Sequence, residues 1–357
     1  MRIAQIAPLH ESIPPKLYGG TERVVSYLTE TLVMLGHEVT LFASGDSQTR
    51  ARLRPGTERA LRLNPQAQDP FAPHILMLQQ VCNQCDGFDI LHFHVDYLHF
   101  PLSRAMGWCH VTTLHGRLDL PELVPLYREF SDVPVVSISN AQRTPLSWAN
   151  WQATIYHGLP LDLYTPQFQP GRYLAFLGRI SPEKGIDRAI EIARRAAVPL
   201  KIAAKVDRVD RDYFEETIKP LLAQPGIEFI GELGERAKSA FLGQALALLF
   251  PIDWPEPFGL AVIEANACGT PVIAFRRGSI PEIIEEGVSG FVVDSAAEAV
   301  AAIRQASHLD RRACRALFER RFSVERMARE YVALYERLLA LGPESKLACA
   351  PWRMTKP

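Results

Sequence analysis

A regular alternation of short apolar runs with longer amphipathic stretches is the feature that most constrains the fold of this 357-residue chain. The alternation occurs twice. The first set of apolar runs covers 3–7, 38–43, 89–94, 110–114 and 134–139. The second set lies near 174 and at 201–206, 227–230, 246–251, 272–275 and 291–293. Strands separated by helices predict parallel, doubly wound sheets, so we expect an α/β protein.

The segment 157–171 separates the two sets, because it is rich in proline and lacks a regular apolar pattern. The chain is also long for a single hydrophobic core. We therefore predict an N-terminal domain at 1–165 and a C-terminal domain at 166–322. A closing helix is expected at 323–341, followed by a frayed polar tail at 342–357.

Composition excludes several classes of protein. Hydrophobic residues make up 47% and charged residues 22%, which is ordinary for a globular protein, and the net charge of −1 gives no whole-molecule attraction to nucleic acid. No run of about 18 apolar residues predicts a membrane span. The short N-terminal apolar run predicts a first strand rather than a signal peptide. We therefore expect a cytoplasmic protein whose six cysteines are reduced.

Two carboxylates flank a predicted strand-to-helix junction. Glu256 follows the apolar run 245–252, and Glu264 lies two turns along a helix expected at about 258–268. The start of a helix has unpaired amides that favour an anion, and those expected here belong to Phe258, Gly259 and Leu260. Because carboxylates would repel phosphates, the two glutamates fit the hydroxyl groups of a ribose and of a hexose.

A second motif supplies positive charge. An apolar strand at 174–177 places Arg179 and, five residues later, Lys184 at its C-terminal end, where open α/β sheets bind ligands. Arginine offers a rigid fork of donors and lysine a point charge, and both suit a diphosphate. Taken alone, the two are more typical of solvated surface charges.

Together the two motifs resemble those of the retaining glycosyltransferases of family 4, which have the GT-B fold. The resemblance extends to 18–25 and 268–274 and covers roughly residues 1–340. It implies two facing Rossmann-like domains, of which the N-terminal one is the acceptor side and the C-terminal one binds a nucleotide sugar. It also implies that the closing helix crosses back to the first domain.

The same resemblance implies a role for each residue of the C-terminal motifs. Arg179 and Lys184 would bind the donor diphosphate and stabilise the charge that develops on it. Glu256 would contact the donor sugar and Glu264 the ribose hydroxyls. The backbone of Phe258, Gly259 and Leu260 would contribute further donors.

Residues of the N-terminal domain are expected to complete the site. Gly19 and Gly20 precede a predicted helix, an arrangement that lets backbone amides approach a phosphate. His115 ends a strand, and the resemblance implies a contact with the donor sugar, although many strands end in a histidine without such a role. Arg143 begins a helix after a strand and is a candidate for meeting the acceptor.

No cofactor or metal is expected. The first strand is not followed by Gly-x-Gly-x-x-Gly, which argues against a nicotinamide dehydrogenase, and there is no Asp-x-Asp pair typical of metal-dependent sugar transferases. Cys82 and Cys85, followed by His92 and His94, leave a zinc site as an alternative to a plain helix end and strand.

The run 50–62 carries five arginines and one glutamate. A solvated loop is the default interpretation. The alternative is docking to an anionic acceptor or to a membrane surface, which would make the protein peripheral to the inner face of the membrane.

We therefore predict a retaining, metal-independent hexosyltransferase that uses a nucleotide sugar and a hydroxyl acceptor, such as a glycan or a lipid-linked acceptor. The resemblance favours a UDP-sugar, with GDP- and ADP-sugars left open. The sequence leaves the acceptor, the linkage and the oligomeric state open, and it does not choose between a covalent intermediate on Glu256 and same-face attack. The alternatives are a sugar-nucleotide 2-epimerase and a non-catalytic protein that binds a nucleotide sugar.

Overall fold

The computed structural model describes residues 1–16 and 19–341, which fall into two compact units. The N-terminal unit comprises Met1–Ile138, Arg143–Gly158 and the chain from Val324, and the C-terminal unit comprises Ser139–Gln142 and Leu159–Ser323. The main boundaries thus fall at 158/159 and 323/324, beside the expected 165/166 and 322/323. The expected tail at 342–357, with Cys349, lies outside the described residues.

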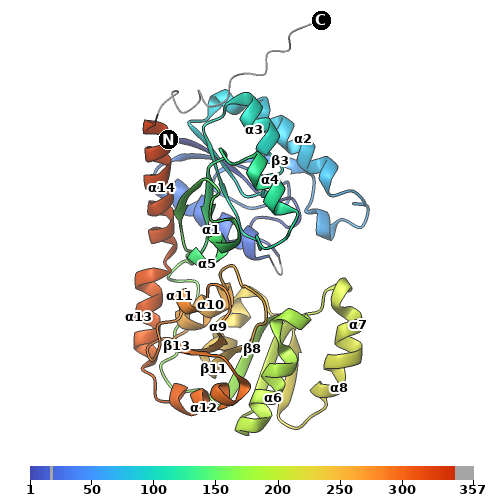
Figure 1. Cartoon of the computed structure of the whole chain (residues 1–357), viewed down its shortest axis with the longest axis vertical. Coiled ribbons are helices and arrows are strands. Elements are labelled where there is room, and N and C mark those ends of the chain that lie inside the picture. Colours follow the sequence, from blue (N-terminus) through green and yellow to red (C-terminus); the bar gives the residue numbers. More distant parts are fainter. Residues whose placement is uncertain (17–18, 342–357) are drawn as a thin grey trace, which may run out of the picture. The chain divides into compact units, whose positions relative to one another are not determined.

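A seven-stranded parallel sheet forms the centre of the N-terminal unit (Figure 1). Its order is β3-β2-β1-β4-β5-β6-β7. The strands are β1 (Arg2–Ile6), β2 (Glu38–Ser44), β3 (Arg52–Thr57), β4 (Ile90–Phe93), β5 (His110–Thr113), β6 (Val135–Ser137) and β7 (Trp151–Thr154). The order reverses between β1 and β4, and open sheets bind ligands outside the carboxyl ends of the strands at such a reversal.

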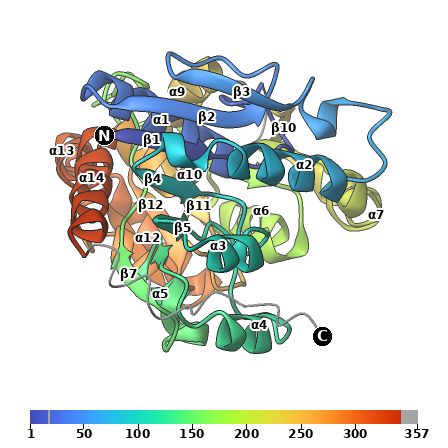
Figure 2. The ribbon, with the colours of Figure 1, turned by 90° about the horizontal axis from the view of Figure 1, so that it is seen from above.

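Helices cover both faces of this sheet, because successive side chains of a strand point to opposite faces. From β1, Ala4 and Ile6 pack in one apolar cluster with Met77 of a helix, whereas Gln5 donates to the Tyr335 hydroxyl at 3.2 Å. Tyr335 belongs to the closing helix, which lies beside the N-terminus of the chain in both ribbon views (Figures 1 and 2). The helices of this unit are α1 (Gly20–Met34), α2 (Phe71–Cys82), α3 (Phe100–Met106), α4 (Leu123–Glu129) and α14 (Val324–Ala340).

The C-terminal unit is built on a six-stranded parallel sheet of order β10-β9-β8-β11-β12-β13. The strands are β8 (Tyr173–Arg179), β9 (Leu200–Lys205), β10 (Ile227–Gly231), β11 (Ala245–Phe250), β12 (Val272–Phe275) and β13 (Gly290–Val293). This order reverses between β8 and β11, which pair directly. A second ligand-binding position of the same kind is therefore expected there.

Helices also cover this second sheet. One face packs through Ile190 of α6 and Ile303 of α12 into the main apolar cluster of the unit, and α13 packs on α10. The helices are α6 (Ile186–Ala196), α7 (Arg211–Tyr213), α8 (Lys219–Leu222), α9 (Glu235–Gly243), α10 (Leu260–Ala267), α11 (Ile280–Ile283), α12 (Ala296–Ala306) and α13 (Arg311–Arg321). The short helix α5 (Asn140–Arg143) contains the boundary at 142/143, so that Arg143 belongs to the N-terminal unit.

The expected α/β class with parallel, doubly wound sheets is confirmed, and two details differ from the sequence analysis. The run 50–62, expected as a loop, contains the edge strand β3, whose residues are only half-buried or exposed. Helix α10 begins at Leu260 rather than at 258, because Gly259 has φ 91° and cannot continue a right-handed helix.

Candidate functional site

Lys184 and Glu256 form an ion pair at the strand-order reversal of the C-terminal unit. Lys184 follows β8 and Glu256 follows β11, and the neighbouring carboxyl ends of these strands bring the two residues together. Lys184 Nζ lies 2.6 Å from Glu256 Oε2, and both side chains are largely buried. Two residues selected from separate motifs thus form one contact.

Trp254 joins this pair, and the sequence analysis did not single it out. Its indole N–H donates to Glu256 Oε2 at 2.8 Å, and its ring centroid lies 4.7 Å from Lys184 Nζ. A tryptophan two residues before Glu256, in the loop that follows β11, is a signal that the sequence does contain. The indole therefore contacts both the ammonium and the carboxylate.

Arg179 lies among carboxylates. Its guanidinium Nη2 donates to Glu183 at 2.5 Å, and its Nε lies 3.4 Å from Asp210 Oδ2. Asp207 is 3.9 Å away and also pairs with Lys205 at 2.5 Å. The guanidinium is thus positioned by local acidic groups at the end of β8.

The start of α10 presents backbone groups beside Glu256. Gly259 is the N-cap in a left-handed conformation, and Leu260 is the first helical residue, whose amide has no acceptor within the helix. Phe258 is buried, and its carbonyl accepts from the Ser279 hydroxyl at 2.7 Å. The Phe258 side chain is therefore part of the core, and the role expected for its backbone stays a prediction.

Glu264 is almost wholly buried, with 2% of its side chain exposed. Its Oε1 lies 3.5 Å from Lys238 Nζ of α9, which the sequence analysis did not select. A buried carboxylate needs such a partner. The hydroxyl-binding role expected for Glu264 has not been tested.

Gly19 and Gly20 begin α1 in the N-terminal unit, with Gly19 as the N-cap. A side chain on Gly19 would come within 2.9 Å of Glu22 Oε2, so the absence of one lets the Glu22 carboxyl lie against the backbone. Burial raises the pKa of Glu22 to about 7. A phosphate at these amides would meet this carboxyl group.

His115 belongs to a buried chain of hydrogen bonds. His115 Nε2 lies 2.9 Å from His94 Nδ1, and His94 Nε2 lies 2.7 Å from Gln5 Oε1. Because the Gln5 oxygen accepts, His94 Nε2 carries a proton and His94 Nδ1 accepts from His115. Burial lowers the pKa of His115 to about 3, so the ring is neutral.

The Arg143 side chain contacts the edge strand β7. Its Nη1 donates to the Thr154 hydroxyl of β7 at 3.3 Å, and its guanidinium carbon lies 5.3 Å from the Trp151 ring centroid. The structure therefore gives this candidate acceptor residue two partners on β7.

The alternative of a zinc site receives no support from the described residues. His92 uses both ring nitrogens, at 2.7 Å from the hydroxyls of Thr113 and Tyr335. Throughout 1–16 and 19–341, no group of three or more His, Cys, Asp or Glu side chains is arranged to hold a metal. Cys82, Cys85, Cys109, Cys268 and Cys314 carry free thiols. In the same ranges, none of the helices combines the length and the apolar character needed to cross a bilayer.

Comparison with known families assigns both halves of the chain. Residues 18–155 match Glycosyltransferase Family 4, and residues 166–320 match Glycosyl transferases group 1. Each half of the chain therefore matches a glycosyltransferase family. The match to the second family includes Arg179, Lys184, Glu256 and Glu264.

Similar sequences include proteins that are named as glycosyltransferases. D-inositol 3-phosphate glycosyltransferase from Mycolicibacterium smegmatis is 30% identical over 184 residues, which cover 45% of this chain and 39% of that protein. An uncharacterized glycosyltransferase from Methanocaldococcus jannaschii is 23% identical, over 81% of this chain and 85% of that protein. The match to the mycobacterial relative thus spans about two-fifths of its length.

Solved structures share the fold over nearly the whole chain. A sucrose-phosphate synthase from Thermosynechococcus elongatus has a TM-score of 0.79 at 20% identity and covers 96% of this chain and 100% of that one. The Anabaena protein HepE, solved with UDP and glucose, has a TM-score of 0.74 at 20% identity, over 94% of this chain and 100% of that one. The expected GT-B fold class is confirmed.

Proposed function

We propose that this protein is a retaining hexosyltransferase that moves a sugar from a UDP-sugar to a hydroxyl acceptor. The observation that carries the proposal is the Lys184–Glu256 ion pair at the strand-order reversal of the C-terminal unit. A cation suited to phosphate and a carboxylate suited to sugar hydroxyls are adjacent there. The group 1 family match over the same residues supports this interpretation, and the HepE structures with UDP and UDP-glucose support the choice of nucleotide.

Lys184 and Arg179 have complementary roles in this proposal. The donor diphosphate attracts both cations and draws Lys184 away from Glu256, which leaves the carboxylate to bind the transferred sugar. As the bond to the anomeric carbon breaks, the two cations stabilise the charge on the departing UDP. In other transferases a metal ion stabilises this charge. We propose that the two cations do so here and that turnover needs no metal ion.

The surroundings of Glu256 favour same-face attack over a covalent intermediate. The Trp254 indole N–H donates to Oε2 and keeps this contact after the diphosphate has drawn Lys184 away, and a donor on this oxygen reduces its nucleophilicity. In same-face attack, the acceptor oxygen forms the new bond on the side from which UDP leaves. A phosphate oxygen of UDP takes the acceptor proton, and neutral His115 contacts the donor sugar.

Calorimetric titration tests the donor assignment. In the presence of EDTA, the protein is titrated with UDP, GDP and ADP, and then with the corresponding nucleotide sugars. We expect UDP to bind most tightly, and turnover of its sugar to be unchanged by EDTA. Product analysis then separates the alternatives, because a transferase yields a glycoside, an epimerase yields a new nucleotide sugar, and a binding protein yields neither.

We also propose that the arginine-rich region contacts anionic membranes. Arg52 and Arg59 are exposed on and beside edge strand β3, while Arg50 and Arg62 pair with Glu30 and Glu11. Helix α2 packs against β3 and exposes Phe71, Ile75 and Leu76, each by more than half. Exposed basic and apolar side chains are typical of peripheral membrane surfaces.

Vesicle sedimentation tests this contact. We expect binding to phosphatidylserine vesicles at low salt that weakens as salt rises. The double variant Arg52→Gln/Arg59→Gln should bind about thirtyfold less, since each basic residue near such a surface contributes about 1 kcal/mol. Arg304→Gln, at an exposed position of α12, is the control. An absence of binding at low salt would refute the proposal.

A further inference from the structure

A pocket of about 380 Å³ lies at the strand-order reversal of the N-terminal unit. Its walls come from residues that follow β1, β4 and β5, from the start of α1 and from the start of α2. They are Pro8, His10, Thr21, Glu22, Pro70, Phe71, His74, His94, Val95, Asp96, Tyr97, Leu98, His115 and Gly116. The carboxyl ends of β1 and β4 are where an open sheet of this order binds a ligand.

The charged groups of this wall are carboxyls. Glu22 and Asp96 line the pocket, and none of the described lining residues is lysine or arginine. Arg62, whose charge acts on Glu22, forms an ion pair with Glu11 at 2.5 Å. An anionic ligand would therefore meet carboxylates without a cation of the wall to balance its charge.

The histidines of the wall are neutral. Burial lowers the pKa of His10, His74, His94 and His115 below the ordinary value. Hydrogen bonds hold His74 in one orientation, because its Nδ1 lies 2.6 Å from the Pro70 carbonyl and its Nε2 accepts from the Leu9 amide at 3.0 Å. These rings therefore bring no positive charge to the wall at neutral pH.

Asp96 is held in an uncommon conformation at the mouth of the pocket. Its φ is 49°, in the left-handed region that non-glycine residues seldom adopt, and the residue is exposed. Desolvation by neighbouring protein atoms nevertheless raises the pKa of its carboxyl to about 6. Strained backbone of this kind is found mainly at functional sites.

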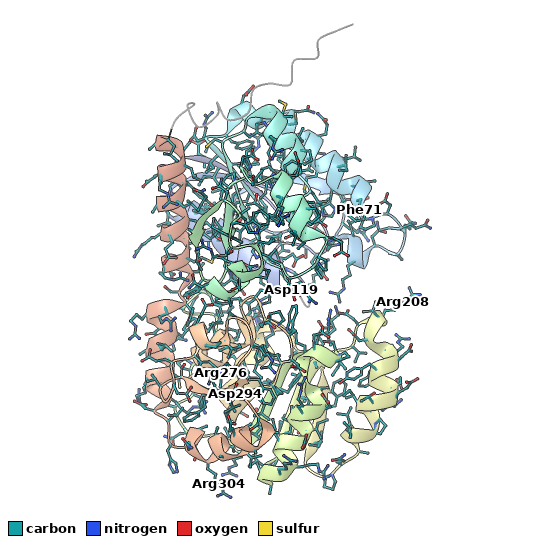
Figure 3. All side chains as sticks on the ribbon, viewed as in Figure 1. Phe71, Asp119, Arg208, Arg276, Asp294 and Arg304 are labelled. Atoms are coloured by element: carbon teal, nitrogen blue, oxygen red, sulfur yellow. The ribbon has the colours of Figure 1, made fainter. Side chains whose placement is uncertain are left out.

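Apolar rings complete the wall. Tyr97 is 39% exposed and Phe71 is 64% exposed, although both line the pocket. Phe71 lies at the start of α2 at the outer edge of its unit (Figure 3). Carboxylates that accept from hydroxyls, beside rings that cover C–H faces, form a surface suited to a sugar.

We infer that this pocket binds the acceptor, and that the acceptor is a neutral, hydroxyl-rich glycosyl group rather than a phosphorylated one. The inference rests on the proposed function, because a transferase needs a second substrate and the diphosphate-binding residues lie in the other unit. It separates this chain from the relative named for D-inositol 3-phosphate, whose acceptor carries a phosphate. Asp96 and Glu22 accept hydrogen bonds from acceptor hydroxyls and repel anions.

Saturation-transfer NMR on the full chain tests the inference. The probes are the methyl glycosides of glucose, galactose, mannose and N-acetylglucosamine, each compared with its 6-phosphate. We expect at least one neutral glycoside to bind at least tenfold more tightly than its phosphate. Tighter binding of the phosphates, or binding of neither form, would overturn the inference.

Two variants connect the result to the pocket. At pH 8, above the raised pKa values of both carboxyls, Asp96→Asn and Glu22→Gln remove a negative charge with little change in shape, and each should reduce the preference for the neutral glycoside by severalfold. Asp86→Asn, on the exposed surface of the same unit, is the matched control and should leave the preference unchanged. An unaltered preference in both pocket variants would also overturn the inference.

UDP titration of the same samples keeps the two proposals distinguishable. If the glycosides bind as expected while UDP does not, the pocket assignment holds and the donor assignment fails. If UDP binds and its sugar is transferred preferentially to phosphorylated acceptors, the proposed function holds and the acceptor inference is wrong.

Discussion

Lys184 and Glu256 neutralise each other, and this determines how each is expected to respond to mutation. Their 2.6 Å contact pairs two largely buried charges. In the proposed reaction the donor diphosphate would compete with Glu256 for Lys184, so that phosphate binding would replace the energy of the ion pair. Removing either partner leaves the other buried and unpaired.

Lys184→Ala should weaken UDP binding by about 10- to 100-fold, because hydrogen bonds to charged groups contribute about 1.5–3 kcal/mol. Turnover should fall with it, since the charge on the departing UDP loses a partner. Calorimetry and product formation measure the two effects. Lys219→Ala, at an exposed position, serves as control, and a Lys184→Ala enzyme with normal affinity and rate would exclude the assigned role.

Glu256→Ala should affect turnover more than nucleotide binding. Its carboxylate is assigned to the sugar, so kcat should drop by about 100-fold or more while the Kd for UDP changes less than tenfold. Single-turnover kinetics and titration with UDP separate the two quantities. The opposite pattern, in which affinity falls and kcat persists, would place Glu256 on the nucleotide side.

Trp254→Phe tests the hydrogen bond to Glu256 by itself. Phenylalanine keeps an aromatic ring near Lys184 but removes the N–H that donates at 2.8 Å. We expect about a tenfold loss of kcat with UDP affinity preserved. Trp254→Ala, which also removes the ring, should in addition weaken UDP binding. Equal kcat in wild type and Trp254→Phe would show that the N–H has no part in turnover.

Among the secondary-structure elements, α13 is fixed to its unit by arginine side chains, of which Arg311 is the buried one. Arg311 donates to the carbonyls of Gln167, Ala245 and Gly243 at 2.7–2.8 Å and to the Thr270 hydroxyl. Burial lowers its pKa. One guanidinium thus contacts three segments that meet at α13, two of them through backbone carbonyls.

Arg311→Met should lower the free energy of unfolding by about 3 kcal/mol or more, because several buried acceptors lose their partner at once. Urea unfolding followed by circular dichroism measures the change. Arg304→Met on α12 is the control; this arginine is exposed (Figure 3). A loss below about 1 kcal/mol would mean that water or another side chain replaces the guanidinium.

The sequence predicted the central strands well and missed the edges of the N-terminal sheet. Strands such as β12 are buried on both faces and appear as continuous apolar runs, so their limits could be placed closely. Edge strands β3 and β7 pair on one side only and are half-exposed, and β3 contains arginine, proline and glycine. Their pairing depends on the neighbouring strand, which no local pattern records.

The sequence predicted which residues form the candidate site better than it predicted the contacts between them. Because β8 and β11 are neighbouring parallel strands, the residues that follow them lie at the same edge of the sheet. The two sequence motifs therefore meet in one site. That Lys184 would pair with Glu256, and that Trp254 would contact both, depends on the path of the loop after β11. The Asp96 conformation and the pocket wall depend on packing between distant segments, which the sequence pattern does not encode.

For the molecule as a whole, buried neutral histidines make stability depend on pH. Burial lowers the pKa of His92, His94, His99, His115 and His157, all in the N-terminal unit. Below the ordinary pKa of 6.5, the unfolded chain binds protons that the folded protein does not. Their contribution is therefore fully present above about pH 6.5 and is lost as the pH falls.

Two carboxyls act in the opposite sense. The pKa values of Glu22 and Asp96 are raised to about 7 and about 6, so the folded state takes up these protons first and gains stability as the pH falls. Each histidine costs about 1.4 kcal/mol per pH unit below 6.5. The five histidines cost about 7 kcal/mol between pH 7.5 and 5.5 and the two carboxyls contribute about 3 kcal/mol in the opposite sense, so the net effect is a loss of stability by about 4 kcal/mol.

Urea unfolding at pH 7.5, 6.5 and 5.5 measures this dependence. His99→Gln should remove about one proton from those taken up on unfolding, and so reduce the slope of the unfolding free energy against pH below pH 6.5. It should also lower stability at pH 7.5 through lost contacts with Phe93 and Thr112. His308→Gln, at an exposed position, should leave the slope unchanged. Stability that stays level or rises from pH 7.5 to 5.5 would show that the buried histidines are already protonated in the folded protein, and the neutral hydrogen-bond chain around His94 and His115 would then be wrong.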